Sequence, residues 1–216
     1  VVIHGGGFVV GSRTMKPVRL LAARLVATGA AVCAIDYRMI LRGGRLDEAV
    51  DDVAEALHWW REQTATHDLD PHQICALGLS AGGALMLLAA GRGDAALERM
   101  VGLFGIYDFG HLQGGVGAMI PARLMRTRDR EIWQQRSPVS APQAPCPLLL
   151  IHGTEDGLVP VEQAETLRSA RAAAQLPTQT LIIPGAPHGF LNWPNAAADE
   201  ALIAIEAFVA TGTVAP

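Results

Sequence analysis

The chain passes directly from a strand-like run to a helix-like run at Ile74-Cys75-Ala76-Leu77-Gly78-Leu79-Ser80-Ala81-Gly82-Gly83. The apolar residues before Gly78 have the length of a buried strand, and residues 84–90 are rich in strong helix formers. The pattern G-x-S-x-G joins the two runs. A chain that turns this sharply crowds its backbone, and glycines on both sides of the turn relieve the crowding. The pattern therefore predicts that Ser80 projects from a strained turn at the positive end of a helix.

Three further apolar runs each end in a loop that contains glycine and polar side chains. Residues 1–3 lead into His4-Gly5-Gly6-Gly7, residues 148–151 lead into the loop of Asp156, and residues 181–183 lead into the loop of His188. Along the chain the order is a glycine loop, a serine, an acid and a histidine. This set of motifs resembles the α/β-hydrolase superfamily, specifically its HGGG-type carboxylesterases in the acetyl-esterase or hormone-sensitive-lipase-like branch.

The resemblance implies an α/β-hydrolase fold in a single domain, residues 1–216, with a mostly parallel sheet of about six strands and helices on both faces. The alternation of strand-like and helix-like runs agrees with this architecture. Residues 105–145 are less regular, and the resemblance makes them a small lid-like insertion. We expect strands at residues 1–3, 30–35, 74–79, 100–104, 148–151 and 180–183, and helices at residues 14–28, 46–64, 161–174 and 195–210.

The strand at residues 1–3 corresponds to the third of the eight strands in similar hydrolases, so the first two strands of the usual fold are expected to be absent. Residues 30–35 then form an apolar sheet edge, which is an association hazard. We expect another chain, in a homo-oligomer, or the closing helix to cover this edge, or else the chain to be an N-terminally shortened version of a longer protein.

Composition limits the class of protein. The 216 residues are 50% hydrophobic and 18% charged, which fits one globular enzyme domain. The net charge of −4 and the absence of a basic run argue against a nucleic-acid partner. The sequence contains neither an apolar stretch of ~18 residues nor a signal-peptide pattern, which favours a cytoplasmic location without a membrane partner, although the chain does not begin with methionine. Cys33, Cys75 and Cys146 have no metal-ligand spacing, so neither a metal nor a cofactor is expected.

The serine, acid and histidine motifs suit nucleophilic catalysis. A neutral serine hydroxyl needs a base within hydrogen-bond reach, and His188 can serve as that base if a buried carboxylate orients its imidazole. Similar esterases place aspartate at the position of Asp156, and Glu155 is then a solvated neighbour. We therefore predict a catalytic triad of Ser80, His188 and Asp156.

The glycine loop suits oxyanion stabilisation. Attack on an ester carbonyl creates a negative oxygen that preset N–H donors must meet. We expect these donors to be the backbone N–H groups of Gly5, Gly6 and Ala81, and which two glycines of the loop donate stays open. His4 is expected to orient the backbone of this loop, and His152 to brace the loop of the acid.

Four apolar side chains next to these motifs could line an acyl or alcohol pocket, and ordinary core packing is the alternative for each of them. They are Phe8, Leu158, Phe190 and Trp193.

Charged side chains outside the motifs have two features of interest. Asp52 is expected to pair with Arg38, because similar positions pair in the family. Four arginines lie on an expected helix of the insertion, where they either attract an anionic substrate or form a solvated face. They are Arg123, Arg126, Arg128 and Arg130.

The motifs favour a serine carboxylesterase that cleaves small, short-acyl esters through an acyl-enzyme. Formamidase-like relatives share the glycine loop and the serine motif, so an amide or formamide hydrolase with the same triad is the alternative. A third hypothesis is a non-catalytic ligand receptor on the same scaffold. Such receptors have typically lost the histidine, and His188 argues against this hypothesis.

Overall fold

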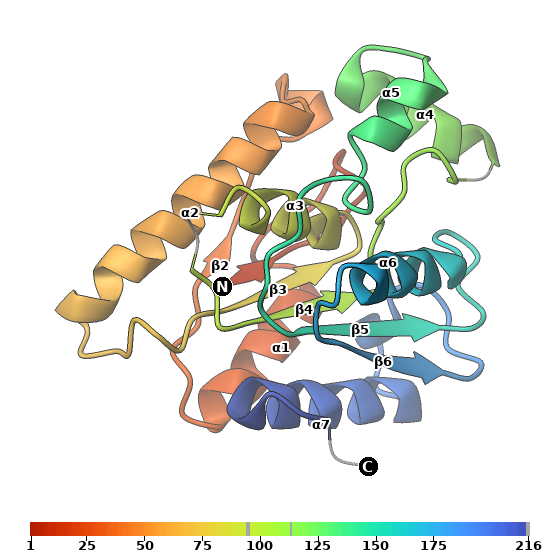
Figure 1. Cartoon of the computed structure of the whole chain (residues 1–216). Coiled ribbons are helices and arrows are strands. Elements are labelled where there is room, and N and C mark those ends of the chain that lie inside the picture. Colours follow the sequence, from red (N-terminus) through yellow and green to blue (C-terminus); the bar gives the residue numbers. More distant parts are fainter. Residues whose placement is uncertain (94–95, 113, 215–216) are drawn as a thin grey trace.

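The computed structural model describes residues 1–93, 96–112 and 114–214. Its centre is a six-stranded sheet of order β2-β1-β3-β4-β5-β6, in which all neighbouring strands run parallel (Figure 1). The predicted parallel sheet of about six strands is therefore confirmed. The strands are β1 (Val2–Ile3), β2 (Ala34–Ile35), β3 (Cys75–Leu79), β4 (Arg99–Leu103), β5 (Leu148–Gly153) and β6 (Thr178–Ile183).

Helices cover both faces of the sheet (Figure 1). Two of them, α1 (Lys16–Ala27) and α7 (Ala196–Thr211), pack with one strand face into one hydrophobic cluster. The opposite face packs with three others, α2 (Leu46–Thr66), α3 (Ala81–Ala90) and α6 (Glu162–Ala173). These five helices agree with the predicted helical segments to within a few residues, as expected for helix ends.

The two apolar layers follow from the alternation of side chains along each strand. In β3, Ala76 joins the cluster on the side of α2 and α3, whereas Leu77 and Leu79 join the cluster beneath α1 and α7. The strand β5 is buried along its whole length because both of its faces are covered. Helix α3 is buried almost all round, which explains why its sequence is apolar without an amphipathic period. The Ser80 turn is therefore held between two of the most buried elements.

The strand expected at residues 30–35 is much shorter in the structure. Only Ala34 and Ile35 pair in register, with Val2 and Ile3 of β1. Just before this pair, the Val2 N–H donates to the Cys33 carbonyl at 2.8 Å. The prediction was therefore right about the existence of this edge strand and wrong about its length.

The 105–145 insertion contains two helices in the described residues, α4 (Gly114–Met125) and α5 (Arg130–Gln135). Residue 113 lies outside the described residues. Two short 3-10 helices, η1 (Ile40–Arg42) and η2 (Phe190–Asn192), are also present. Among the described helices, none has the length and hydropathy that crossing a membrane requires.

The predicted pair between Arg38 and Asp52 is confirmed. The Arg38 Nη2 atom lies 2.8 Å from Asp52 Oδ1, and the Arg38 backbone N–H donates to Asp52 Oδ2 at 2.7 Å. The pair ties the segment after β2 to the first turns of α2. Since both groups are partly solvated, its main effect is to fix the path of the loop.

Candidate active site

Ser80 occupies the strained turn that its flanking glycines predict. It lies between β3 and α3 with φ of 52° and ψ of −116°, a conformation that L-residues seldom adopt. A Cβ atom at Gly78 would lie 2.5 Å from the Gly82 carbonyl oxygen, and one at Gly82 would lie 2.4 Å from the Ile3 carbonyl oxygen. Both positions therefore require glycine, because the backbones of β1, β3 and α3 approach too closely for any side chain.

The structure brings Ser80, His188 and Asp156 together from three separate loops. The Ser80 Oγ atom lies 3.1 Å from His188 Nε2, and His188 Nδ1 lies 2.7 Å from Asp156 Oδ2. The three loops follow β3, β6 and β5, whose carboxyl ends meet at one edge of the parallel sheet. The three side chains thus form one continuous hydrogen-bonded row.

Asp156 is held on both of its oxygens. Its Oδ1 atom accepts hydrogen bonds from the backbone N–H groups of Leu158 at 3.0 Å and Val159 at 2.8 Å. Its Oδ2 atom faces two imidazoles, that of His188 and that of His152, whose Nε2 lies 3.2 Å away. His152 Nε2 also lies 2.8 Å from the Val159 carbonyl oxygen, so it carries the proton and braces both sides of the acid loop, as expected.

The neighbouring acid, Glu155, is exposed to solvent, as expected. The side chain of Asp156 is fully buried in the same turn. Burial taken by itself raises the pKa of Asp156, but the hydrogen bonds from His152, His188 and the Val159 N–H outweigh it and hold that pKa well below its usual range. The carboxylate is therefore ionised at neutral pH. It then accepts a hydrogen bond from the Nδ1–H of His188, which leaves Nε2 unprotonated and facing the Ser80 hydroxyl.

The lowered pKa of Asp156 predicts a contribution to acid stability. In the unfolded chain an aspartate protonates near pH 3.9, above the folded-state value, so the unfolded state binds the proton first as the pH falls. The contribution of Asp156 to the free energy of unfolding is complete above about pH 5 and is lost as the pH falls through about 4 toward the folded-state pKa. Its size is on the order of 2 kcal/mol. Urea unfolding at a series of pH values should show that the free-energy gap between wild type and Asp156→Asn narrows over this window. A constant gap would contradict the prediction.

The glycine loop lies directly against the serine. A Cβ atom at Gly5 would lie 3.1 Å from the Ser80 Cβ, and Gly6, with φ of +111°, would place a Cβ 1.8 Å from the Val10 carbonyl oxygen. Ala81, the third predicted donor, is the first residue of α3. Gly5 and Gly6 line the same cavity as Ser80, and Ala81 directly follows it, so the oxyanion site stays a prediction that this arrangement permits.

His4 supports this loop from below. Its ring is fully buried, stacks on Tyr37 at 4.3 Å between centroids, and places Nδ1 2.6 Å from the Gly5 carbonyl oxygen. Burial lowers the pKa of His4, so the ring is neutral at neutral pH and its Nδ1–H donates to Gly5. The Tyr37 hydroxyl donates to the His4 carbonyl at 3.1 Å. The expected role of His4, orientation of the glycine loop, is confirmed.

A mostly apolar cavity of about 540 Å³ opens above Ser80 and His188. Of the four side chains predicted to line a pocket, Leu158 does so. The other three need correction. Phe8 and Phe190 are buried in the core, where Phe8 packs edge-on against Phe109, and Trp193 is 60% exposed on the surface outside the cavity. Adjacency to a motif failed as a guide because successive residues in a tight loop point in different directions.

Sequence reasoning missed the aromatic wall of the cavity. Phe104 follows β4 with φ of 39° and packs edge-on against His188 at 5.1 Å and against Phe190 at 5.3 Å between centroids. It occupies the end of a sheet strand, as the serine and acid loops do, and this position is the pattern that could have identified it. The insertion adds Leu112 and Ile120 to the cavity lining, so part of this segment forms a wall of the site.

The fold and the three converging loops define the chain as an α/β-hydrolase. Its structure superposes on a hyperthermophilic esterase from the archaeon Pyrobaculum calidifontis with a TM-score of 0.83 and 24% identity, covering 99% of this chain and 76% of that one. A truncated carbohydrate esterase from gut microbiota gives 0.82 and 20% identity, covering 97% and 83%. The chain belongs to the BD-FAE family, whose model matches residues 1–170.

Curated relatives agree with this assignment. Esterase LipC of Mycobacterium tuberculosis is 32% identical over 88% of this chain and 52% of its own length. The probable carboxylic ester hydrolase LipM of the same organism is 30% identical over 96% of this chain and 53% of its own length. The chain thus spans about half the length of these relatives. The predicted resemblance to carboxylesterases of the α/β-hydrolase superfamily is confirmed.

Proposed function

We propose that the chain hydrolyses carboxylic esters through an acyl-enzyme, with Ser80 as nucleophile, His188 as general base and acid, and Asp156 as the group that orients His188. The observation that carries the proposal is the continuous row from Ser80 Oγ through both nitrogens of His188 to the buried carboxylate of Asp156. The row begins at the floor of an apolar cavity, where an ester can displace water.

The chemistry follows from the positions of the protons. As Ser80 Oγ bonds to the ester carbonyl carbon, its proton moves to His188 Nε2 and the carbonyl oxygen becomes an oxyanion. The N–H groups proposed to receive this oxyanion belong to Gly5, Gly6 and Ala81. When the carbon–alkoxy bond breaks, His188 returns the proton to the leaving alcohol. A water molecule then repeats the sequence on the acyl-enzyme and releases the carboxylic acid.

The proposed substrate class is small esters with short acyl groups. The cavity at Ser80 is enclosed by apolar side chains from β3, the insertion and the acid loop, including Leu79, Ile120 and Val159. Its volume of about 540 Å³ falls in the usual range for small-molecule sites. A curated relative named ethyl acetate hydrolase, from Pseudomonas putida, is 27% identical over 94% of this chain and 70% of its own length, which supports the proposal.

A chain-length series of p-nitrophenyl esters tests the proposal. We expect kcat/KM to be highest for acetate to butyrate and to fall by about tenfold or more by decanoate. Each methylene that the pocket accommodates contributes roughly 1 kcal/mol of binding free energy, and a methylene that extends beyond the pocket contributes none. A fluorophosphonate probe should label Ser80 and abolish the activity. A preference for long chains would contradict the short-acyl assignment, and failure to label Ser80 would contradict the esterase assignment.

The alternative reaction, amide or formamide hydrolysis, uses the same three residues and differs in the leaving group that His188 must protonate. Rates on an aryl formamide and on the matching aryl acetate separate the two reactions. We expect the acetate to react faster. The third hypothesis, a non-catalytic receptor, is disfavoured because His188 is retained within hydrogen-bond distance of Ser80.

A further inference from the structure

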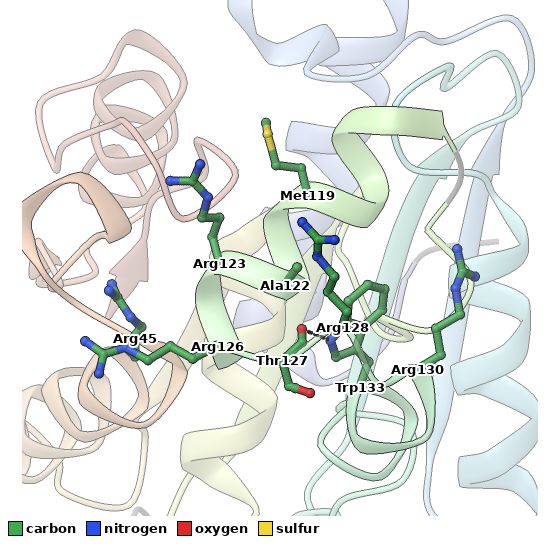
Figure 2. Close-up of a pocket in the computed structure, with 9 residues that line it drawn as sticks. All are labelled: Arg45, Met119, Ala122, Arg123, Arg126, Thr127, Arg128, Arg130 and Trp133. Atoms are coloured by element: carbon green, nitrogen blue, oxygen red, sulfur yellow. Dashed lines mark hydrogen bonds between the residues drawn. The ribbon is translucent and has the colours of Figure 1, made fainter.

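A second cavity, of about 820 Å³, lies against the insertion and has a lining rich in arginine (Figure 2). Its lining comes from the start of α2, from α4 and the residue after it, and from α5 and the segment before it. No residue of this lining is shared with the cavity at Ser80. The lining consists of Arg45, Met119, Ala122, Arg123, Arg126, Thr127, Arg128, Arg130 and Trp133.

The charge of this cavity is unbalanced. Within the described part of the chain, the lining holds five arginines and no carboxylate, although the whole chain carries a net charge of −4. Guanidinium groups stay protonated at any physiological pH, so the five charges repel one another. In the described ranges these five arginines make no ion pair with a carboxylate. The arginines that do so are Arg13, Arg24, Arg38, Arg92, Arg99 and Arg136.

Three acidic side chains close to the lining in sequence are engaged in local structure. The Asp129 carboxylate caps α5 by accepting the Glu131 N–H at 2.9 Å. Glu48 accepts the Arg45 backbone N–H at 3.1 Å, and Asp47 pairs with Arg136. The guanidinium groups of the cavity are therefore left to solvent or to an external anion.

Part of this donor set is held in place. The Arg130 guanidinium lies 5.7 Å from the centroid of the Trp133 ring and donates to the Gly110 carbonyl at 3.2 Å. The indole of Trp133 is itself buried, and its Nε1–H donates to the Thr127 carbonyl at 3.0 Å. Arg45 donates through Nη1 to the Gly44 carbonyl, while its Nε–H is buried and has no partner among the described residues. A recessed, unsatisfied N–H is a costly feature unless a ligand reaches it.

We propose that this cavity binds a small molecule with two or more phosphate or carboxylate groups. Planar guanidinium forks match both oxyanions and can bind them bidentately. Figure 2 shows Arg45, Arg123 and Arg126 on one side of Ala122 and Arg130 on the other, a spread that suits several anionic groups. The volume is that of a small-molecule site, so a soluble ligand fits better than a flat lipid surface.

Isothermal titration calorimetry with inorganic pyrophosphate and tripolyphosphate tests the proposal. We expect saturable one-to-one binding that is tighter for tripolyphosphate and weakens as ionic strength rises. The double variant Arg123→Gln/Arg126→Gln should weaken binding by about tenfold or more, because each charge-assisted hydrogen bond contributes strongly. Both side chains are exposed. Position 126 has a positive φ of 55°, and glutamine, like arginine, is not glycine, so the substitution adds no backbone strain and the variant is expected to fold.

The matched control is Arg19→Gln/Arg168→Gln, which removes the same charge from exposed positions on α1 and α6. It should change the affinity by less than about twofold. If both variants weaken binding equally, net charge alone explains the effect, and the proposed site is overturned. The absence of polyphosphate binding to the wild-type protein would overturn it too. Binding to phosphatidylserine-containing phosphatidylcholine vesicles, without binding of the soluble polyphosphates, would also overturn it in favour of a lipid surface. The probes contain no carboxylic ester, so the outcome is independent of the proposed esterase activity.

Discussion

Replacing Ser80 with alanine is expected to lower kcat on p-nitrophenyl acetate by about five to six orders of magnitude, as the loss of a triad nucleophile does in serine hydrolases. The Ser80 Oγ atom is the group in the hydrogen-bonded row that faces the apolar cavity, so no neighbouring hydroxyl in the row can replace it. Alanine leaves His188 and the glycine loop in place. Steady-state assays, with active-site titration to exclude contaminating enzyme, measure the effect.

The matched control for this variant is Ser169→Ala, on the exposed face of α6. It makes the same chemical change on a helix outside the row and should leave kcat and KM unchanged. Alanine at position 80 meets the same backbone strain as serine, since neither residue is glycine, so thermal unfolding of Ser80→Ala should stay close to wild type. Activity of Ser80→Ala above about 1% of wild type, with an unchanged fold, would refute the proposed nucleophile.

Replacing Asp156 with asparagine is expected to lower kcat by about four orders of magnitude. Because Oδ1 accepts the N–H groups of Leu158 and Val159, the amide oxygen of the asparagine must take this place and its NH₂ group must face His188. That NH₂ donates to His188 Nδ1 and moves the ring proton to Nε2. In this tautomer His188 cannot accept the proton of Ser80, so the base is lost although the shape of the site is kept.

The same substitution should also lower stability. The new NH₂ group faces the Nε2–H of His152, and two donors then meet inside a fully buried turn. We expect a loss of about 1–3 kcal/mol at neutral pH, measured by urea unfolding. The control is Glu155→Gln, the exposed acid next in sequence, which should change kcat by less than about twofold. A large loss of kcat in Glu155→Gln, or a small loss of kcat in Asp156→Asn, would assign the role of the acid to Glu155.

The residues proposed for catalysis could be predicted because each one lies in a glycine-containing loop after an apolar strand, and because similar esterases place aspartate at the position of Asp156. In a parallel sheet, such strand ends lie at one edge whatever the details of packing. The tight turn at Ser80 was predictable for a local reason as well, since Gly78 and Gly82 leave no space for a Cβ atom. The same local reasoning did not extend to Phe8 and Phe190, which are next to the motifs but point into the core.

By itself the sequence determined the strand and helix order and the serine turn, because these depend on short patterns and on the geometry common to parallel sheets. Together with the resemblance to known esterases, it also predicted the residues of the hydrogen-bonded row. The tertiary structure decided what surrounds them. The aromatic contact of Phe104 with His188 and the meeting of Arg45 with the arginines of α4 and α5 both join residues across long stretches of chain. Such contacts depend on how side chains pack after the elements come together, and no local pattern encodes that packing.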